Sequence, residues 1–289
     1  MSNENHIHFR DNNLQPLLTV EHLKKYYPVQ TGFIRQGASD IKAVDGVSFQ
    51  IYPGETLGLV GESGSGKSTI GKVIVGLEKP TEGRILFDGR DISGLSSKEM
   101  MSLRSDLQIV FQDPYSSLNP RKRIVDLLAE PLKVHRIVPA KDISGEVDRL
   151  LELVRLPRSS KNRYPHEFSG GQRQRIGIAR ALSLKPKLII CDEPVSALDV
   201  SIQAQILNLL KDLQKELNLT YLFIAHGLGA VKYVSDRIAV MHQGKIVEIG
   251  TKAEIFHDPK HPYTKALLDA SPIADPRLRN KKKLTNVPG

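Results

Sequence analysis

The chain has 289 residues, of which 40% are hydrophobic and 25% charged, and 41 Lys and Arg against 32 Asp and Glu give a formal net charge of +9. This composition is close to that of soluble globular proteins and excludes collagen-like, fibrous and intrinsically disordered chains. The positive charge fits a phosphate-bearing ligand, a nucleic acid or an anionic lipid equally well, so charge alone does not choose a function. At about 150 residues per domain, the length predicts one large domain or two closely joined ones.

Membrane insertion and export are not expected. No stretch of the sequence approaches the ~18 consecutive apolar residues that a membrane-spanning helix needs. The first residues are polar, and they show neither the apolar centre nor the small-residue cleavage site of a secretory signal. The single cysteine, Cys191, permits no internal disulfide and no four-thiolate metal or iron–sulfur site within one chain. We therefore expect a protein that works in the cytosol.

The first part of the chain predicts strands and then a strand–loop–helix unit. Between residues 17 and 52, apolar side chains such as Val47 and Phe49 alternate with polar neighbours, which predicts an antiparallel sheet edge. Residues 56–60 form a short apolar run that predicts a buried strand, and a glycine-rich stretch follows it. The next apolar positions have helical spacing: Ile70, Val73, Ile74 and Leu77.

The second part of the chain predicts helices followed by further strands. Residues 114–184 carry apolar side chains at three- and four-residue spacing, which predicts a helical subdomain. Residues 187–192 and 220–225 predict buried strands, and the segment between them predicts a helix with one apolar face. Such alternation indicates an α/β fold whose parallel sheet is covered on both sides. Two short runs, 237–241 and 245–248, predict a final hairpin.

A phosphate-binding loop is the strongest functional signal. Residues 61–68 satisfy G-x-x-x-x-G-K-S between a predicted strand and a predicted helix. Glycines let backbone N–H groups surround phosphate oxygens, and the helix N-terminus adds partial positive charge. Lys67 is expected to reach the β- and γ-phosphates, and Ser68 to ligate Mg²⁺. The candidate nucleotide-binding residues of this loop are Gly61, Glu62, Ser63, Gly64, Ser65, Gly66, Lys67, Ser68 and Thr69.

Two carboxylates end the predicted strand at residues 187–192. Because the carboxyl ends of parallel strands meet at one edge of a sheet, these side chains are expected to face the phosphate loop. Asp192 is then a candidate to hold Mg²⁺ through water, and Glu193 is a candidate to polarise an attacking water. A positioned general base contributes about 10²–10⁴ in rate.

A second loop opens a helix rich in arginine, and its sequence is Phe168-Ser-Gly-Gly-Gln172. Together with the phosphate loop, this segment makes the chain similar to the ATP-binding-cassette (ABC) ATPase family, whose signature is Leu-Ser-Gly-Gly-Gln. Phe168 takes the first place here. The resemblance implies that two chains pair head to tail around two nucleotides, with four signature residues facing the ATP of the partner: Ser169, Gly170, Gly171 and Gln172.

The resemblance covers nearly the whole chain and implies roles for three more residues. Gln112, in Phe-Gln-Asp-Pro, matches the glutamine that touches Mg²⁺ and the water and reports the nucleotide state to a membrane partner. Asp199 matches the loop that crosses the dimer, and His226 matches the switch histidine that contacts the γ-phosphate. The family usually has Asp after this histidine, whereas this chain has Gly227, which caps a helix less specifically.

The resemblance also implies an aromatic residue stacked on adenine, and Tyr27 is the candidate. Tyr26 is its neighbour in sequence, so either tyrosine could fill this place, and a tyrosine packed within a strand explains the position as well. Stacking of this kind contributes about 0.5–1.5 kcal/mol, which tunes affinity without defining the enzyme.

Within the family, Asp113–Pro120 and His261–Leu268 resemble the oligopeptide/dipeptide and nickel importer subgroup. From its residues alone, the second stretch predicts only a turn followed by a short helix. The resemblance implies a RecA-like P-loop NTPase core with an antiparallel β subdomain and an inserted helical subdomain. The expected division is a nucleotide-binding core of residues 1–113 and 185–250, a helical subdomain of residues 114–184 that carries the signature, and a C-terminal extension of residues 251–289 typical of peptide importers.

The resemblance implies an ATPase that uses ATP and Mg²⁺ to power peptide uptake from the cytoplasmic face of the membrane. Implied partners are a second, different ATPase chain, two permease chains and an external solute-binding protein, with no nucleic acid. Two alternatives stay open: the transported solute could be nickel or another small solute, and the two ATPase chains could be identical.

Two other classes of P-loop protein fit the sequence less well. Soluble ABC ATPases that act on ribosomes or nucleic acid usually carry tandem cassettes or a long coiled-coil insertion, and too few residues separate Lys67 from Ser169 to hold one. A P-loop GTPase or kinase leaves the segment 168–172 unexplained, and the chain lacks the Asn-Lys-x-Asp base reader of GTPases.

Overall fold

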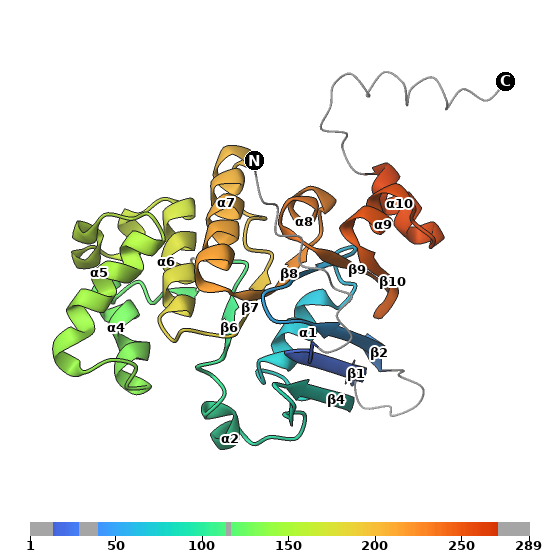
Figure 1. The fold of residues 1–289 in the computed structure, drawn as a ribbon, viewed down its shortest axis with the longest axis horizontal. Coiled ribbons are helices and arrows are strands. Elements are labelled where there is room, and N and C mark those ends of the chain that lie inside the picture. Colours follow the sequence, from blue (N-terminus) through green and yellow to red (C-terminus); the bar gives the residue numbers. More distant parts are fainter. Residues whose placement is uncertain (1–13, 29–39, 114–116, 271–289) are drawn as a thin grey trace, which may run out of the picture.

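The computed structural model describes residues 14–28, 40–113 and 117–270, which form two β-sheets and the helices around them (Figure 1). In chain order the elements are β1 (Leu18–Tyr27), β2 (Ile41–Ile51), β3 (Thr56–Val60), α1 (Lys67–Ile74), β4 (Glu82–Phe87), β5 (Arg90–Asp91), α2 (Ser97–Met101), β6 (Leu107–Val110), α4 (Ile124–Val134), α5 (Ile143–Leu153), α6 (Gly170–Leu182), β7 (Leu188–Asp192), α7 (Val200–Leu217), β8 (Thr220–Ala225), α8 (Leu228–Val234), β9 (Arg237–His242), β10 (Lys245–Thr251), α9 (Lys252–His257) and α10 (Pro262–Ala270).

The larger sheet has six strands in the order β10-β9-β3-β8-β7-β6. All neighbouring pairs are parallel except β9 and β10, which form the expected hairpin. The predicted strands at 56–60 and 220–225 have the predicted bounds. The sequence analysis missed β6, because it is only four residues long and Gln108 interrupts its apolar run. Its place at the sheet edge brings the loop that carries Gln112 beside the end of β7.

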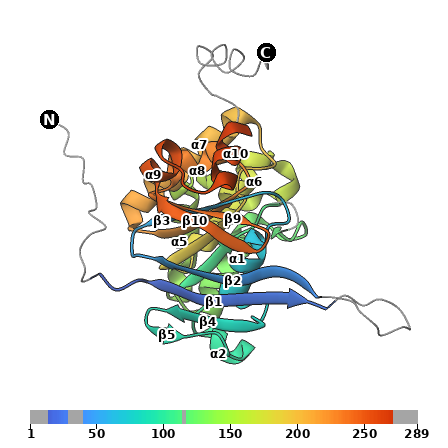
Figure 2. The same ribbon diagram turned by 90° about the vertical axis from the view of Figure 1, so that its right-hand side faces the viewer.

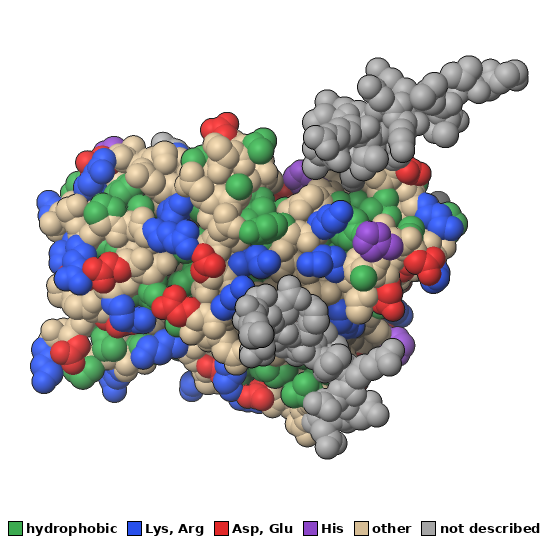
Figure 3. Space-filling model, turned by 45° about the horizontal axis from the view of Figure 1, so that its top comes forward, with side chains coloured by type: hydrophobic (Ala, Val, Ile, Leu, Met, Phe, Trp, Pro, Cys, Tyr) green, Lys and Arg blue, Asp and Glu red, His purple; other side chains and the backbone are tan. Residues whose placement is uncertain are grey.

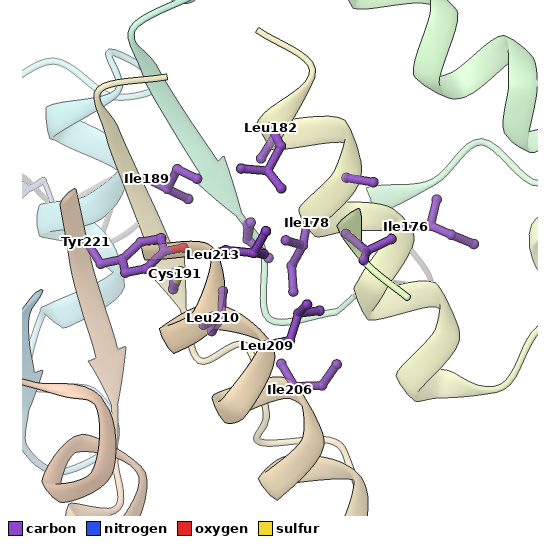
Figure 4. Close-up of a cluster of buried hydrophobic side chains, with 14 of the residues drawn as sticks. Ile176, Ile178, Leu182, Ile189, Cys191, Ile206, Leu209, Leu210, Leu213 and Tyr221 are labelled. Carbon is purple, nitrogen blue, oxygen red and sulfur yellow. The ribbon is translucent and has the colours of Figure 1, made fainter. Parts of the chain in front are cut away.

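Both faces of this sheet are buried, and the side chains of each strand alternate between two hydrophobic clusters. In β7, Ile189 and Cys191 join the cluster formed with α6 and α7, whereas Leu188 and Ile190 join the cluster formed with α1 and the second sheet. Figure 4 shows the first cluster, with side chains from α6, α7, β7 and β8 directed toward one another. Burial raises the pKa of the Cys191 thiol far above its ordinary value, which suits a packing residue.

The smaller sheet has four strands in the order β2-β1-β4-β5, all antiparallel. Residues 17–52 were expected to form an antiparallel sheet edge. Within this range β1 and β2 form part of a separate sheet, because β4 pairs with the other side of β1, and residues 29–39 lie outside the described residues. Figure 2 shows this sheet below the larger one. Helix α1 contributes Ile70, Val73 and Ile74 to the cluster between the two sheets, so the start of α1 has a fixed position relative to both.

The helix predicted after the phosphate loop was drawn too long at its C-terminal end, because the prediction included Leu77. The helix ends at Ile74, and Gly76 follows with a φ of 70°, a left-handed value that terminates helices. Leu77 therefore lies outside the helix and is 56% exposed. The spacing of apolar residues did not predict where the helix ends, because Leu77 continues the helical spacing on the far side of Gly76.

Helices α4, α5 and α6 pack against one another beside β6, β7 and α7 (Figure 1). Their buried side chains belong to the same hydrophobic cluster as those of β7, α7 and β8. The division of the chain at residues 113/114, 184/185 and 250/251 stays a prediction, because this shared cluster marks no boundary. Among the described residues, no helix is long and apolar enough to cross a membrane.

The contact between β3 and α8 leaves no room for a side chain at Gly58. A Cβ atom there would clash with Val231 and with Ser235 at the end of α8. We expect Gly58→Ala to lower the free energy of unfolding by about 1–3 kcal/mol, because overpacking displaces the helix. Gly229→Ala is the matched control: its Cβ would have nothing within 4 Å, and alanine stabilises a helix by about 0.5–1 kcal/mol relative to glycine. Denaturant unfolding of both variants tests this, and equal stability would contradict it.

Candidate active site

The phosphate loop lies between the end of β3 and the start of α1, as the sequence predicted. Gly66 is the N-terminal cap of α1 and has a φ of 102°, and a Cβ atom there would clash with the carbonyl oxygen of Ala43. The Lys67 side chain turns back over the loop, and its Nζ donates to the carbonyl oxygens of Gly61 at 2.8 Å and Glu62 at 2.7 Å. The loop thus holds its lysine on the side from which phosphates would approach.

A pocket of about 450 Å³ opens over this loop. It is lined by Ala43, Ser63, Gly64, Gly66, Lys67, Ser68, Thr69, Gln112, Glu193 and His226. Of the nine candidate loop residues, Gly61, Glu62 and Ser65 do not line the pocket. The first two hold the lysine by their carbonyl groups, and Ser65 is buried beneath the loop.

Charge around Lys67 acts in two directions. Burial lowers the pKa of its ammonium group, and the nearby carboxylates of Glu193, Asp192 and Glu62 raise it. An anionic phosphate would add to the second effect and favour the charged form of the lysine. The site is therefore suited to an anionic ligand on electrostatic grounds.

Ser68 and Asp192 meet below the pocket, where the Ser68 hydroxyl donates to Oδ1 of Asp192 at 2.7 Å. Burial raises the pKa of Asp192, while the Ser68 hydrogen bond and the charges of Lys72 and Lys67 oppose this. The donor chemistry fits Mg²⁺, a hard cation that takes one or two protein oxygens together with phosphate oxygens and water. Among the described residues no cluster of three or more His, Cys, Asp or Glu could hold a metal.

Two of the predicted catalytic residues, Gln112 and His226, contact the same carboxylate oxygen of the third, Glu193. Gln112 Nε2 donates to Oε2 of Glu193 at 2.9 Å, and His226 Nδ1 lies 3.1 Å from the same atom. The three side chains follow β6, β7 and β8, whose carboxyl ends meet at one edge of the sheet. Glu193 has a φ of 47°, an uncommon backbone conformation for a residue other than glycine that fits a position constrained for function.

Gly227 stands where helix α8 begins. It is the N-terminal cap of α8 and provides no side-chain hydrogen bond to the helix. His226 nevertheless reaches Glu193, so the contact at 3.1 Å forms without a capping aspartate.

The signature residues do not line the pocket of their own chain. Ser169 caps α6: its hydroxyl accepts from the N–H of Gln172 at 3.4 Å, and the Gln172 side chain accepts from the N–H of Ser169 at 3.0 Å. Gly170 and Gly171 form the first turn of the helix behind this cap. Asp199 caps α7 without a side-chain bond, and Val200 beside it is 81% exposed. Both caps therefore lie outside the pocket of their own chain, and Val200 is open to solvent.

Neither candidate for adenine stacking lines the pocket. The Tyr27 hydroxyl donates to Glu78 just beyond α1, and the Tyr26 hydroxyl donates to Oδ1 of Asp45 at 2.5 Å. Burial is the main cause that raises the pKa of Tyr27, and its hydroxyl also interacts with Thr69. Because Thr69 does line the pocket, Tyr27 lies on the phosphate-loop side of the sheet, and its role in stacking stays a prediction.

Sequence reasoning gave no role to two residues that contact the phosphate loop. Ala43 of β2 lines the pocket, and its backbone carbonyl oxygen lies against Gly66, a contact that no motif marks. Tyr263 of α10 accepts a hydrogen bond from the N–H of Glu62 at 3.2 Å, across 201 positions in the sequence. The only signal for Tyr263 was its place in the segment His261–Leu268, which was noted for its resemblance and not for its chemistry.

Residues 44–196 match the family model of the ABC transporter. An oligopeptide transport ATP-binding protein, AppF of Bacillus subtilis, is 54% identical over 272 residues, which cover 94% of this chain and 83% of that protein. The chain belongs to the oligopeptide-transport family of ABC transporter ATP-binding proteins. The family predicted from the phosphate loop and the signature is confirmed, as is the P-loop NTPase fold with its antiparallel β subdomain.

Further comparisons agree with this family. Residues 247–289 match the model of the oligopeptide/dipeptide transporter C-terminal region. The oligopeptide transport ATP-binding protein OppF of Streptococcus mutans is 56% identical over 255 residues, covering 88% of this chain and 83% of that protein. As an ABC transporter ATP-binding protein, the chain is an ATPase that couples ATP hydrolysis to transport.

Solved structures of ABC cassettes share this fold. The cassette MJ0796, in a dimeric post-hydrolysis state with ADP and Pi, aligns with a TM-score of 0.72 and 29% identity over 81% of this chain and 98% of that one. The cassette CbiO1 of Clostridium perfringens, part of an ABC transporter complex, aligns with a TM-score of 0.75 and 31% identity over 94% of this chain and 99% of that one.

Proposed function

We propose that this ABC ATPase powers the uptake of oligopeptides and dipeptides through a membrane permease. The ATPase part of the proposal is carried by the contacts of Glu193 beside the phosphate loop. Its Oε2 atom lies 2.9 Å from Nε2 of Gln112 and 3.1 Å from Nδ1 of His226. The match of residues 247–289 to the oligopeptide/dipeptide transporter C-terminal region supports the peptide substrate. Relatives named for oligopeptide transport, with 54% and 56% identity, support it further.

The proposed reaction is the attack of a water molecule on the γ-phosphate of ATP. The triphosphate lies over the loop, with Lys67 directed to its β- and γ-phosphate oxygens. As the bond from water oxygen to phosphorus forms and the bond from phosphorus to the β–γ bridging oxygen breaks, Glu193 accepts a proton from the water. Gln112 and His226 hold the carboxylate of Glu193 in place for this transfer.

Mg²⁺ is the expected metal, and Ser68 and Asp192 are the residues that would hold it, with Gln112 as a third candidate. When bound, it supplies positive charge that offsets the negative charge of the phosphates. We expect Asp192 to hold Mg²⁺ through a water molecule rather than directly, because its carboxylate already accepts the hydrogen bond of the Ser68 hydroxyl at 2.7 Å.

The signature segment is proposed to complete the pocket of a second cassette. The segment lies at the start of α6, outside the pocket of its own chain: Ser169 is exposed, Gly170 and Gln172 are half-buried, and Gly171 is buried against α7. A helix N-terminus favours a negatively charged group, which suits contact with a γ-phosphate held by a partner. The dimeric state named for the MJ0796 cassette supports the pairing of two cassettes. Asp199, next to the 81% exposed Val200, is proposed to lie at the same interface.

The proposed assembly lies at the cytoplasmic face of the membrane. It contains this chain, a different ATPase chain, two permease chains and an external solute-binding protein. Gln112, which follows β6 beside the helical segment, is proposed to pass the nucleotide state to the permease. On the face shown in Figure 3, basic and acidic side chains are interspersed, so this face offers no argument for a ribosome or nucleic-acid role.

Uptake measurements distinguish the peptide proposal from its alternatives. Cells whose only copy of this chain carries Glu193→Gln are expected to lose uptake of labelled di- and oligopeptides by about 100-fold, since a positioned base contributes 10²–10⁴ in rate. Glu82→Gln, which changes an exposed carboxylate paired with Lys24 at 2.6 Å, is the matched control and should leave uptake unchanged. Unchanged peptide uptake in the Glu193 variant would contradict the peptide proposal, and loss of nickel uptake instead would favour the metal-ion alternative.

A further inference from the structure

The start of helix α10 contacts the phosphate loop, although no nucleotide-binding motif includes it. The hydroxyl oxygen of Tyr263 accepts a hydrogen bond from the backbone N–H of Glu62 at 3.2 Å. Figures 1 and 2 show α10 beside the β9–β10 hairpin, at the end of the larger sheet. The C-terminal region, 201 positions away in sequence, therefore touches the second residue of the loop.

One peptide unit connects this tyrosine to the lysine of the loop. The peptide bond between Gly61 and Glu62 is trans, so its N–H and C=O groups point in opposite directions within one plane. Its N–H donates to Tyr263, and its C=O accepts from Nζ of Lys67 at 2.8 Å. Fixing the N–H therefore fixes the direction of the carbonyl group that holds Lys67.

Several contacts hold Tyr263 rigidly enough for this task. Its ring stacks on His242 at the end of β9, with the ring centroids 3.9 Å apart and the planes inclined by 27°. Its N–H donates to Nδ1 of His261 at 3.1 Å. The N–H groups of Lys260 and His261 donate to the carboxylate of Glu248 in β10, at 2.7 and 3.0 Å. The turn before α10 is thus anchored to the sheet that carries the loop.

The hydroxyl of Tyr263 has the right protonation state to accept this bond over the physiological range. Burial is the main cause that raises its pKa, and the N–H of Glu62 opposes this effect. The Glu62 carboxylate, which interacts with the same hydroxyl, also raises this pKa. The hydroxyl thus stays neutral, so that it can donate to this carboxylate while its oxygen accepts from the Glu62 amide.

We infer that Tyr263 is a positioning residue for ATP, which acts through the 61–62 peptide to orient Lys67 toward the phosphates. The inference rests on ATP binding in this pocket and extends the nucleotide site into the C-terminal region. Loss of the hydroxyl leaves the peptide free to rotate, so Lys67 binds phosphate less well in the ground state and in the transition state alike. Such uniform loss raises KM and leaves kcat nearly unchanged.

Tyr263→Phe tests this, because it removes the hydroxyl and keeps the ring that stacks on His242. In titrations of the full-length chain with fluorescent ATP and Mg²⁺, the Kd is expected to rise about fivefold, the loss of one ordinary hydrogen bond. In the assembled transporter the KM for ATP should rise similarly with kcat nearly constant. Tyr233→Phe is the matched control, since it removes a tyrosine hydroxyl that donates to Asn208 away from the pocket.

A second variant separates positioning from packing. His242→Ala removes the stacking platform and should also weaken ATP binding, but it should add little when combined with Tyr263→Phe, because both changes act on the same hydrogen bond. An unchanged Kd for Tyr263→Phe, an equal rise for Tyr233→Phe, or a melting temperature without nucleotide that falls by more than about 5 °C would overturn the inference. Wild-type chain that binds no ATP would instead contradict the nucleotide site itself.

Discussion

Replacing Glu193 with glutamine is expected to lower the kcat of ATP hydrolysis by about 10²–10⁴-fold, the contribution of a positioned general base. The carboxamide has nearly the same shape as the carboxylate and can still accept the hydrogen bond that Gln112 Nε2 donates over 2.9 Å. What it lacks is the ability to take a proton from water. The variant should therefore bind ATP with an affinity close to that of the wild type and retain it without turnover.

Steady-state phosphate release by the assembled complex measures this effect, and fluorescent ATP gives the affinity of the same preparation. Glu82→Gln serves as the control, because it removes an exposed carboxylate of the smaller sheet that does not line the pocket. Because the signature of one cassette is proposed to contact the γ-phosphate held by the other, cleavage of that phosphate should release the pair. The Glu193 variant should therefore accumulate as a dimer in ATP on size-exclusion chromatography. A kcat within about threefold of the wild type, below the range for a lost base, would exclude Glu193 as the base.

Replacing Lys67 with alanine is expected to weaken ATP binding by about 100-fold, because hydrogen bonds to charged groups contribute about 1.5–3 kcal/mol each. The side chain is only 4% exposed and is held by the carbonyl groups of Gly61 and Glu62. Its charge therefore acts from a fixed position in a partly desolvated site, where it is worth more than in water.

Thermal unfolding with and without nucleotide separates lost binding from lost folding. A ligand present at 100 times its Kd stabilises the folded chain by about 2.7 kcal/mol, so the wild type should show a clear rise in melting temperature with ATP. The Lys67→Ala variant should show almost none. Lys187→Ala, which removes an exposed lysine paired with Asp88 at 2.6 Å, should respond as the wild type does. A normal response of the Lys67 variant would exclude the proposed phosphate contact.

The candidate site was predictable wherever a short segment carries its own chemistry. The loop at residues 61–69 needs only its glycines, its lysine and the helix that follows, and these features lie within nine successive positions. The two acidic residues at the end of β7 were predictable for a similar reason, because an apolar run that ends in carboxylates marks the edge of a parallel sheet. The signature was recognised by its pattern, and its cap at Ser169 is again a local structure.

The sequence alone determined the family, the α/β character and the strand–loop–helix unit, because these depend on local spacing and on motifs. Tertiary structure decided which distant residues meet: Gln112 and His226 reach Glu193 across 81 and 33 positions. It also decided that β1 and β2 belong to a separate sheet, and that the Tyr263 hydroxyl accepts a hydrogen bond from the phosphate loop at Glu62. Such contacts depend on strand order and on the packing of elements far apart in the chain, and no local pattern of side chains encodes either.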